Sequence, residues 1–277
     1  MNIPWKLKSA IFRIIEVTNA TRSLSFFQKF VTRRAFTKVS KVNPAWLLHE
    51  EVLLKFDSTK YVLEVGAGQS LIQNLYLSKI CDRQLVIDLF PILDMSAVSR
   101  AVDFLGSIGR LNSSEAVRVQ ADLRNYGLEY RAPCELKDLT LESDKFDAII
   151  STDTFEHIPF SELRLILDDL KKVLKPSGIL SVCIDYSDHY SHTDKSISDL
   201  NFLKYSDDEW AKYNHRHHFQ NRARHNDYRE IFLEAGFSIA VDRVLAYSQT
   251  KSLEHSGYSQ EEKDDAFATS GFFVLRP

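Results

Sequence analysis

Two histidines lie in a short polar segment, residues 185–194, that also carries Asp188 and Asp194. A histidine can take a proton from a hydroxyl near neutral pH, and a neighbouring carboxylate can orient its ring or raise its basicity. We therefore expect His189 to act as a general base, with His192 as the second candidate. The alternative is that both histidines only bond the backbone of their own loop.

A third histidine and several polar side chains extend this group. His157 lies in the segment 155–158, and we expect it to organise a site rather than perform a substrate-specific step. In the stretch after residue 185, guanidinium groups can grip a carboxylate or phosphate, and aromatic rings can form a wall suited to a sugar. Core packing is the alternative for some of the rings. The residues expected to contact a substrate are Asp188, Tyr190, Arg222 and Arg224.

Four histidines between residues 215 and 225 raise the question of a metal. No carboxylate or cysteine stands at ligand spacing in that run, and such a run is more often a polar loop, so we expect no metal. The three cysteines are odd in number and far apart, which fits neither a disulfide framework nor a zinc site. This pattern favours a reducing, cytoplasmic location.

Two glycines follow a short apolar segment with the spacing of a tight strand-to-helix turn. Residues 61–65 are predicted as a strand, Gly66, Ala67 and Gly68 as the turn, and residues 71–80 as a helix. Glycine lets a ligand approach the backbone at the amino end of a helix. The turn alone is equally compatible with a purely structural role, so its neighbours must decide whether it binds a nucleotide-like ligand.

Asp88 stands at the end of the next predicted strand, about 20 residues after the glycines, where an acid can accept hydrogen bonds from both ribose hydroxyls. The alternative is that it caps the following turn. A dinucleotide-binding turn has its third glycine at position 71, where this chain has Leu. The usual close contact with a pyrophosphate would therefore be lost. This departure disfavours NAD.

Asp122 and Leu123 follow residues 116–120, which we predict as the third strand. The carboxylate can accept a hydrogen bond from the exocyclic amine of an adenine, while Leu123 and Leu89 pack on the faces of the ring. The alternative is that Asp122 is a helix N-cap.

The order of these features resembles the class I S-adenosylmethionine-dependent methyltransferases. The resemblance covers about residues 55–275, and its strength lies in the ordered set, because each motif alone is unspecific. The matching segments after Asp122 are Phe-Asp-Ala-Ile-Ile-Ser at 146–151, Phe-Glu-His-Ile at 155–158, Leu-Lys-Pro-Ser-Gly-Ile-Leu at 174–180 and residues 233–237. Gln69-Ser70 departs from the pattern, because many members have a further glycine there.

The resemblance implies S-adenosylmethionine as cofactor and S-adenosylhomocysteine as product. It also implies a seven-stranded sheet whose last strand is antiparallel. The expected cofactor contacts are Gly66, Ala67, Gly68 and Thr152 with the methionine part, Asp88 with the ribose, Asp122, Leu123 and Leu89 with the adenine, and Glu64 as the first acidic member of the set.

Short apolar runs alternate with amphipathic segments along the chain, which is typical of parallel strands joined by helical crossovers. We predict an α/β fold with a seven-stranded, mostly parallel sheet flanked by helices, an N-terminal helical extension and an insertion after the fifth strand. No convincing crossover separates the last two strands, so we expect them to pair antiparallel. The predicted strands are residues 61–65, 84–87, 116–120, 146–151, 178–184, 238–246 and 271–275. The predicted parts are an extension or lid at 1–56 and a methyltransferase domain at 57–277, which includes an acceptor-site insertion at 185–228.

Charge is unevenly distributed in a chain of formal net charge -3. Residues 1–41 carry nine Lys or Arg and one Glu, in two predicted helices with a break at 18–21. This basic extension has three interpretations: a lid over the acceptor site, which we favour, a homodimer surface, or peripheral contact with an anionic membrane. A nucleic-acid partner is not expected, because the remaining chain is acidic. No apolar stretch is long enough for a membrane span, and no signal peptide is evident.

These features together predict transfer of a methyl group to a small-molecule or glycan acceptor, with a hydroxyl oxygen favoured. Two alternatives stay open. One is N-methylation of an amine, for which a base is dispensable. The other is a binding or scaffold protein that keeps the fold without turnover.

Overall fold

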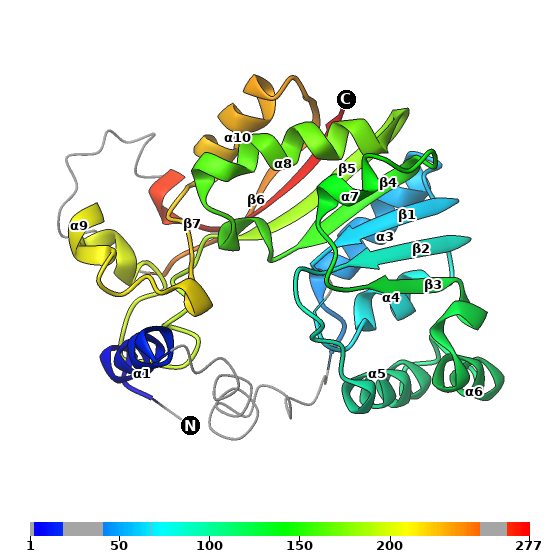
Figure 1. The fold of residues 1–277 in the computed structure, drawn as a ribbon, viewed down its shortest axis with the longest axis horizontal. Coiled ribbons are helices and arrows are strands. Elements are labelled where there is room, and N and C mark those ends of the chain that lie inside the picture. Colours follow the sequence, from blue (N-terminus) through cyan, green and yellow to red (C-terminus); the bar gives the residue numbers. More distant parts are fainter. Residues whose placement is uncertain (1–2, 19–40, 67, 250–264) are drawn as a thin grey trace.

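Seven strands form one sheet at the centre of the structure (Figure 1). The computed structural model describes residues 3–18, 41–66, 68–249 and 265–277. The strand order is β3-β2-β1-β4-β5-β7-β6, and β7 runs antiparallel to both of its neighbours while the other pairings are parallel. The predicted α/β fold with a mostly parallel sheet is therefore confirmed. The strands are β1 (Tyr61–Val65), β2 (Arg83–Ile87), β3 (Leu128–Arg131), β4 (Phe146–Thr152), β5 (Leu174–Asp185), β6 (Ser238–Tyr247) and β7 (Ala268–Arg276).

Helices cover both faces of the sheet, and successive side chains along each strand point to opposite faces. In β1, Val62 packs with the helices α3, α4 and α5, whereas Leu63 packs with α7, α8 and α10. Because both faces are covered, the central strands are apolar along most of their length. The helices of the two layers are α3 (Pro44–Lys55), α4 (Ile72–Leu77) and α5 (Met95–Ser107), and α7 (Leu136–Leu139), α8 (Phe160–Val173) and α10 (His225–Glu234).

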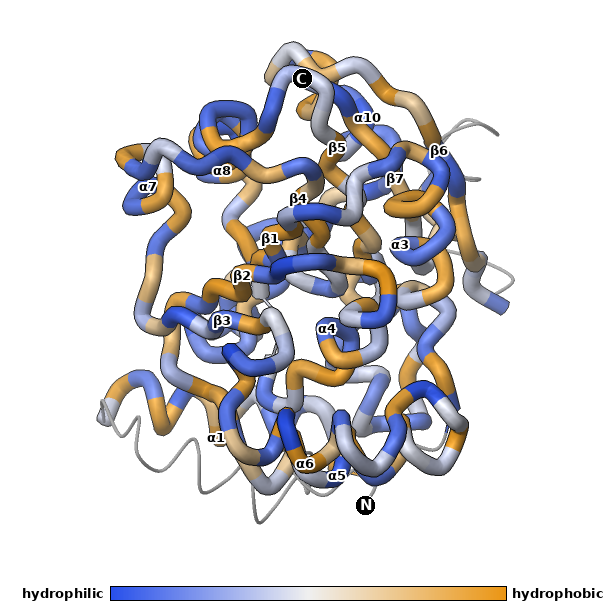
Figure 2. The backbone as a smooth tube through the Cα atoms, turned by 90° about the vertical axis from the view of Figure 1, so that its right-hand side faces the viewer, coloured by the Kyte–Doolittle hydropathy of each residue, from blue (hydrophilic) through white to orange (hydrophobic). Residues whose placement is uncertain are grey.

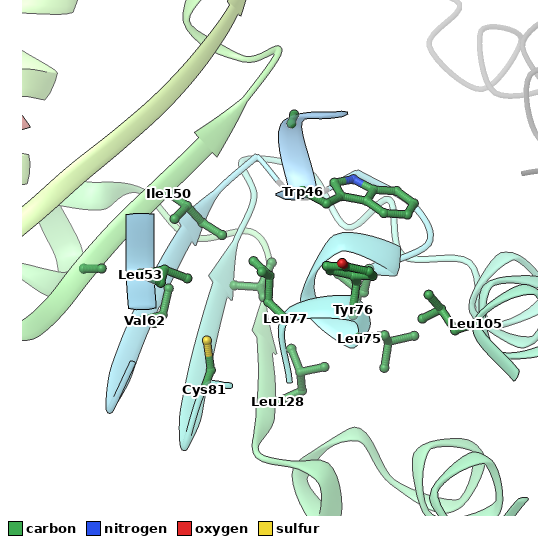
Figure 3. Packing of buried hydrophobic residues seen from close by; sticks show 14 of the residues in the cluster. Trp46, Leu53, Val62, Leu75, Tyr76, Leu77, Cys81, Leu105, Leu128 and Ile150 are labelled. Carbon is green, nitrogen blue, oxygen red and sulfur yellow. The ribbon is translucent and has the colours of Figure 1, made fainter. Parts of the chain in front are cut away.

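The helices next to the sheet are amphipathic. In α8, Leu163, Leu167 and Leu170 are fully buried at the spacing of one helical face, and Figure 2 shows hydrophilic and hydrophobic residues alternating along this helix. On the other face of the sheet, the rings of Trp46 in α3 and Tyr76 in α4 lie 5.7 Å apart between centroids (Figure 3). This packing fixes α4, the helix that follows the glycine turn.

The predicted third strand, residues 116–120, is wrong: these residues belong to the helix α6 (Ser113–Ala121). Asn112 and Glu115 form a capping box, in which each side chain bonds the other residue's backbone N–H, and this arrangement starts a helix. The alternation of Val117 and Val119 suggested a strand, but Val117 is exposed and Val119 buried on the helix. The third strand is β3, which follows a 3-10 helix, η3 (Leu123–Tyr126).

The other predicted strands are confirmed with small shifts at their ends. The largest shift is in β5, which begins at Leu174 rather than at residue 178. The predicted helix 71–80 is shorter and is α4. The last two strands pair antiparallel as predicted, with Val244 opposite Gly271.

The N-terminal helix α1 (Trp5–Val17) packs against the segment that follows β5 rather than against the sheet. Trp5 lies in an aromatic cluster with Tyr190, Phe202 and Trp210, and its backbone N–H donates to Asp194 Oδ2 at 2.8 Å. The second predicted N-terminal helix lies outside the described residues. The short helices of the insertion are η5 (Asn201–Lys204), α9 (Asp207–Trp210) and η6 (Arg216–His218). Figure 1 shows α1 and α9 together, at the opposite end of the molecule from α6.

Candidate functional site

The turn after β1 has a backbone conformation that glycine adopts easily, and a neighbouring residue leaves no room for a side chain. Gly66 has φ of +83°, and its N–H donates to the carbonyl of Ile87 at 3.1 Å. A Cβ built on Gly66 would lie 2.4 Å from Thr154 Oγ1, so any side chain there would collide with the loop after β4. Gly68 has φ of +70° and open space around it. Ala67 lies outside the described residues.

A network of buried polar side chains joins β1 to α4, the helix that follows the turn. Both carboxylate oxygens of Glu64 accept hydrogen bonds, from Gln73 Nε2 at 2.8 Å and from Asn74 Nδ2 at 2.5 Å. Burial raises the pKa of Glu64 to about 8, although these two bonds act in the opposite direction. Glu64 therefore contacts α4 and fixes the helix against β1.

The same network reaches β4 through a predicted cofactor residue. Thr152 Oγ1 donates to Gln73 Oε1 at 3.1 Å and also lies 3.0 Å from His49 Nε2. The other ring nitrogen of His49 lies 2.8 Å from Ser181 Oγ, and burial lowers the pKa of this histidine to about 3. His49 is therefore a neutral link between α3 and the central strands.

Asp88 ends β2 as predicted, at the carboxyl edge of the sheet. Its Oδ1 accepts from the N–H of Phe90 at 3.2 Å, and its carbonyl accepts from the N–H of Cys134 at 3.0 Å. Burial raises the pKa of Asp88, against the effect of the backbone N–H groups. The next two side chains, Leu89 and Phe90, are largely exposed and form an apolar surface beside the carboxylate.

The predicted placement of Asp122 and Leu123 after the third strand is wrong. Both precede β3, with Asp122 directly before η3 and Leu123 as its first residue, at the amino edge of the sheet, whereas the glycine turn and Asp88 lie at the carboxyl edge. Asp122 accepts from the backbone N–H of Arg124 at 2.9 Å, which makes it the cap of η3. The segment that does follow β3 is residues 132–134, joined to Asp88 through Cys134.

Two of the predicted catalytic histidines meet a carboxylate at the end of β5. Asp185 Oδ2 lies 3.4 Å from His189 Nε2 and 3.5 Å from His192 Nε2. Ser187 Oγ lies 3.0 Å from the same nitrogen of His192. Burial favours the neutral form of Asp185, but contacts with His189 and Ser187 outweigh it and lower the pKa of this carboxyl group. Asp185 is therefore an anion beside two imidazoles.

The loop after β4 brings two more carboxyl groups to this place. Glu156 is buried, and its Oε1 lies 4.0 Å from His189 Nε2. Burial and the nearby charge of Asp153 raise the pKa of Glu156 well above its usual range. Burial and the charge of Asp185 raise the pKa of Asp153 to about 6, and Asp153 has φ of +49°.

The third predicted catalytic histidine joins the same group. The rings of His157 and His189 lie 4.9 Å apart between centroids, as do those of His189 and His192. His157 Nδ1 lies 2.8 Å from the carbonyl of Phe219. A carbonyl only accepts, so Nδ1 carries a proton. The fold thus brings all three histidines together from two loops.

Comparison with known proteins decides the family. Residues 32–240 match the family described as a methyltransferase domain. The chain belongs to this family. The observed strand order agrees with the fold that the resemblance to class I S-adenosylmethionine-dependent methyltransferases implied, and the chain is called a methyltransferase below.

Several solved structures are similar to this methyltransferase at low sequence identity. A 1,6-didemethyltoxoflavin-N1-methyltransferase from Burkholderia thailandensis, with 1,6-didemethyltoxoflavin and S-adenosylhomocysteine bound, is 14% identical, with 94% of this chain and 88% of that chain covered and a TM-score of 0.50. An S-adenosylmethionine-dependent methyltransferase from Clostridium acetobutylicum ATCC 824 is 14% identical, with 93% and 98% covered and a TM-score of 0.48. The N-methyltransferase NodS from Bradyrhizobium japonicum WM9 is 16% identical, with 84% and 97% covered and a TM-score of 0.41. No curated protein sequence matches the chain.

The four predicted substrate residues of the methyltransferase hold its insertion together. Asp188 is fully buried and accepts from Asn201 Nδ2 at 3.0 Å, and Tyr190 is buried in the aromatic cluster. Arg222 donates to the carbonyls of Phe202 and Tyr205, and Arg224 donates to three backbone carbonyls, among them that of Tyr186 at 2.8 Å. Both arginines also line a cavity of about 850 Å³ between the insertion and α10.

The sequence did not assign a role to three carboxyl groups at the histidine cluster of this methyltransferase: Asp153, Glu156 and Asp185. Asp153 and Asp185 follow the ends of two predicted strands closely, and Glu156 lies in the loop after the first of them, so their position was the available signal. The described helices include none that is both long and apolar enough to cross a bilayer.

Proposed function

We propose that this methyltransferase methylates a hydroxyl oxygen of a small-molecule or glycan acceptor at the carboxyl ends of β4 and β5. The supporting observation is the contact of Asp185 with both His189 and His192. These groups are close to the cofactor turn, because Thr154, which packs on Gly66, lies two residues before Glu156.

The glycine turn and Asp88 suit the cofactor. Open space around Gly68 admits the methionine part, and the carboxylate of Asp88 at the end of β2 would accept from the ribose hydroxyls. Leu89 would cover one face of the adenine. S-adenosylmethionine supplies an electrophilic methyl group on a sulfonium.

The reaction needs alignment and the removal of one proton. The acceptor oxygen attacks the methyl carbon, the bond between carbon and sulfur breaks, and sulfur keeps the electron pair as S-adenosylhomocysteine forms. The proton of the hydroxyl passes to His189, and the anionic Asp185, which lies 3.4 Å from Nε2 of this residue, stabilises the resulting imidazolium. His192 is the second acceptor for the proton, and His157 packs against His189.

A panel of hydroxylated and amine acceptors with radiolabelled S-adenosylmethionine tests this proposal. We expect methylation of a hydroxyl, with activity lost in a His189→Ala/His192→Ala double variant that still binds S-adenosylhomocysteine. Full activity of the double variant on a hydroxyl acceptor would reject the base. No binding of either cofactor form in calorimetric titration would reject the methyl-transfer function itself.

N-methylation is the second candidate, because the Burkholderia thailandensis protein of similar fold is named as an N1-methyltransferase. A neutral amine already carries the attacking lone pair, so the His189→Ala/His192→Ala variant would keep most of its activity on an amine. The same panel therefore separates the two acceptors.

We also propose that α1 is part of the wall around the acceptor. Ser9 Oγ lies 2.9 Å from His215 Nε2, and Trp5 packs on Tyr190, which joins α1 to the insertion. This arrangement supports the lid interpretation of the basic extension.

A further inference from the structure

The histidine cluster contains two overlapping sets of metal-ligand atoms. Glu156, His157 and His189 form one set, and Asp185, His189 and His192 form the other, with the ligand atoms of each set within 4.8 Å of one another. Both sets share His189. We propose that this cluster binds one divalent transition-metal ion through His189 together with Asp185, His192 and Glu156.

The distances around His189 Nε2 match those between ligands of one ion. Two ligand atoms that are each about 2.1 Å from a tetrahedral metal lie about 3.4 Å apart. The observed separations from His189 Nε2 are 3.4 Å to Asp185 Oδ2 and 4.0 Å to Glu156 Oε1, and Asp185 Oδ2 lies 3.5 Å from His192 Nε2. Asp185, His189 and His192 are therefore spaced like the ligands of one ion, and Glu156 borders this set at His189.

Buried atoms that make no hydrogen bond point to a ligand at this place. Both carboxylate oxygens of Glu156 and Nε2 of His189 are buried without a hydrogen-bond partner of normal geometry among the described residues. Glu156 is 1% exposed and His189 is 7% exposed. An unpaired carboxyl group at such a depth is costly unless a hydrogen bond or a cation compensates it. A divalent cation would compensate both Glu156 and the anionic Asp185.

Neighbouring backbone groups hold the ligand side chains in place, as is usual around metal sites. His157 Nδ1 donates to the carbonyl of Phe219 at 2.8 Å, which fixes the orientation of its ring. Asp185 Oδ1 accepts from the N–H of Ser187 at 2.8 Å, which leaves Oδ2 for the two histidines. His157 belongs to the second set, with Glu156 and His189.

The ligand types indicate the class of ion. Two or three imidazoles with two carboxylates suit Zn²⁺, Mn²⁺, Fe²⁺, Co²⁺ or Ni²⁺, whereas Mg²⁺ and Ca²⁺ favour oxygen ligands. The inference rests on the proposed function for its role: a bound ion would hold the acceptor oxygen and lower its pKa, and His189 Nε2 would then be a ligand instead of the base.

Co²⁺ titration of the full chain, freed of metal by a chelator, tests the site directly. We expect saturable binding of one ion per chain, with visible absorption bands of a coordinated Co²⁺ and a rise in Tm. Loss of a group that only orients a ligand costs about 10–100-fold in affinity, so His189→Ala and Glu156→Gln should weaken binding at least as much. His217→Ala, which removes a histidine outside the cluster, should leave binding unchanged.

Two results would overturn the inference: no saturable Co²⁺ binding by the wild-type chain, or equal binding by wild type and His189→Ala. S-adenosylhomocysteine titration of each variant shows that it is folded, and Glu156→Gln preserves side-chain volume if His189→Ala is unstable. If Co²⁺ does not bind while the cofactor does, the metal inference fails and methyl transfer stands. If neither binds, the proposed function fails as well.

Discussion

Thr154 packs on Gly66 so closely that its Oγ1 would lie 2.4 Å from a Cβ at that position. Through this contact the loop that carries Glu156 and His157 rests on the cofactor turn. We predict that Gly66→Ala displaces both and lowers S-adenosylmethionine affinity at least tenfold, as measured by calorimetric titration.

Gly109→Ala is the matched control for this prediction. Gly109 also has a positive φ, of +73°, but open space surrounds it. Both variants pay about 1 kcal/mol for the left-handed backbone, so only the collision with Thr154 differs. Equal affinities of the two variants would contradict the role given to the contact.

Asp88→Asn and Asp122→Asn together test at which edge of the sheet the cofactor binds. Hydrogen bonds to a charged group contribute about 1.5–3 kcal/mol, so loss of the carboxylate charge should weaken S-adenosylmethionine binding by about 10- to 100-fold. Asp122→Asn should leave the affinity unchanged, because Asp122 caps η3 at the amino edge. Weakened binding by Asp122→Asn would restore the adenine contact that the sequence predicted.

The strands of the sheet could be predicted because the pattern of each strand lies within one short stretch of the sequence. Apolar runs between turn signals located six of the seven strands, and the glycine turn and Asp88 follow directly from two of them. Residues 116–120 were misassigned because Val117 and Val119 alternate like a strand, while the capping box of Asn112 and Glu115 decides for a helix. Because of this error, Asp122 was predicted at the carboxyl edge of the sheet, whereas it lies at the amino edge.

The histidine cluster could be predicted only in part, because its members come from different loops. His189 and His192 are neighbours in the sequence, but Glu156 joins them only because β4 and β5 are adjacent and parallel. From the sequence, a metal site was therefore considered only at residues 215–225, where histidines are close in sequence. Arg222 and Arg224 were expected to face an acceptor, yet Nη1 of each arginine donates to backbone carbonyls of the insertion.

Glu64 should make stability depend on pH. Its pKa is about 8 in the folded state against an ordinary value of 4.5. Between these values the folded chain keeps a proton that the unfolded chain has released, so the free energy of unfolding falls as pH rises. We predict that Glu64→Gln, which cannot ionise, shows a smaller fall in Tm between pH 5 and pH 8, at about the limits of this window.

Glu51→Gln is the control, since Glu51 is exposed on α3. Thermal unfolding followed by circular dichroism at a series of pH values measures both variants against wild type. A Tm profile of Glu64→Gln that runs parallel to that of wild type would show that Glu64 does not hold its proton.

Trp5 anchors α1 on the insertion, and its removal should release the helix without unfolding the sheet. The indole is buried, with ring centroids 5.5 Å from Tyr190 and 4.8 Å from Tyr213. Replacing a buried Trp by Ala costs about 3–5 kcal/mol, and the cluster around Trp5 consists of residues of the insertion. We therefore predict that Trp5→Ala speeds tryptic cleavage after Arg13, followed by mass spectrometry, while S-adenosylmethionine affinity stays unchanged. Leu7→Ala, at a 55% exposed position of the same helix, should be cleaved like wild type. If both variants are cleaved at the same rate, the aromatic contact does not hold α1, and the proposed wall around the acceptor loses its support.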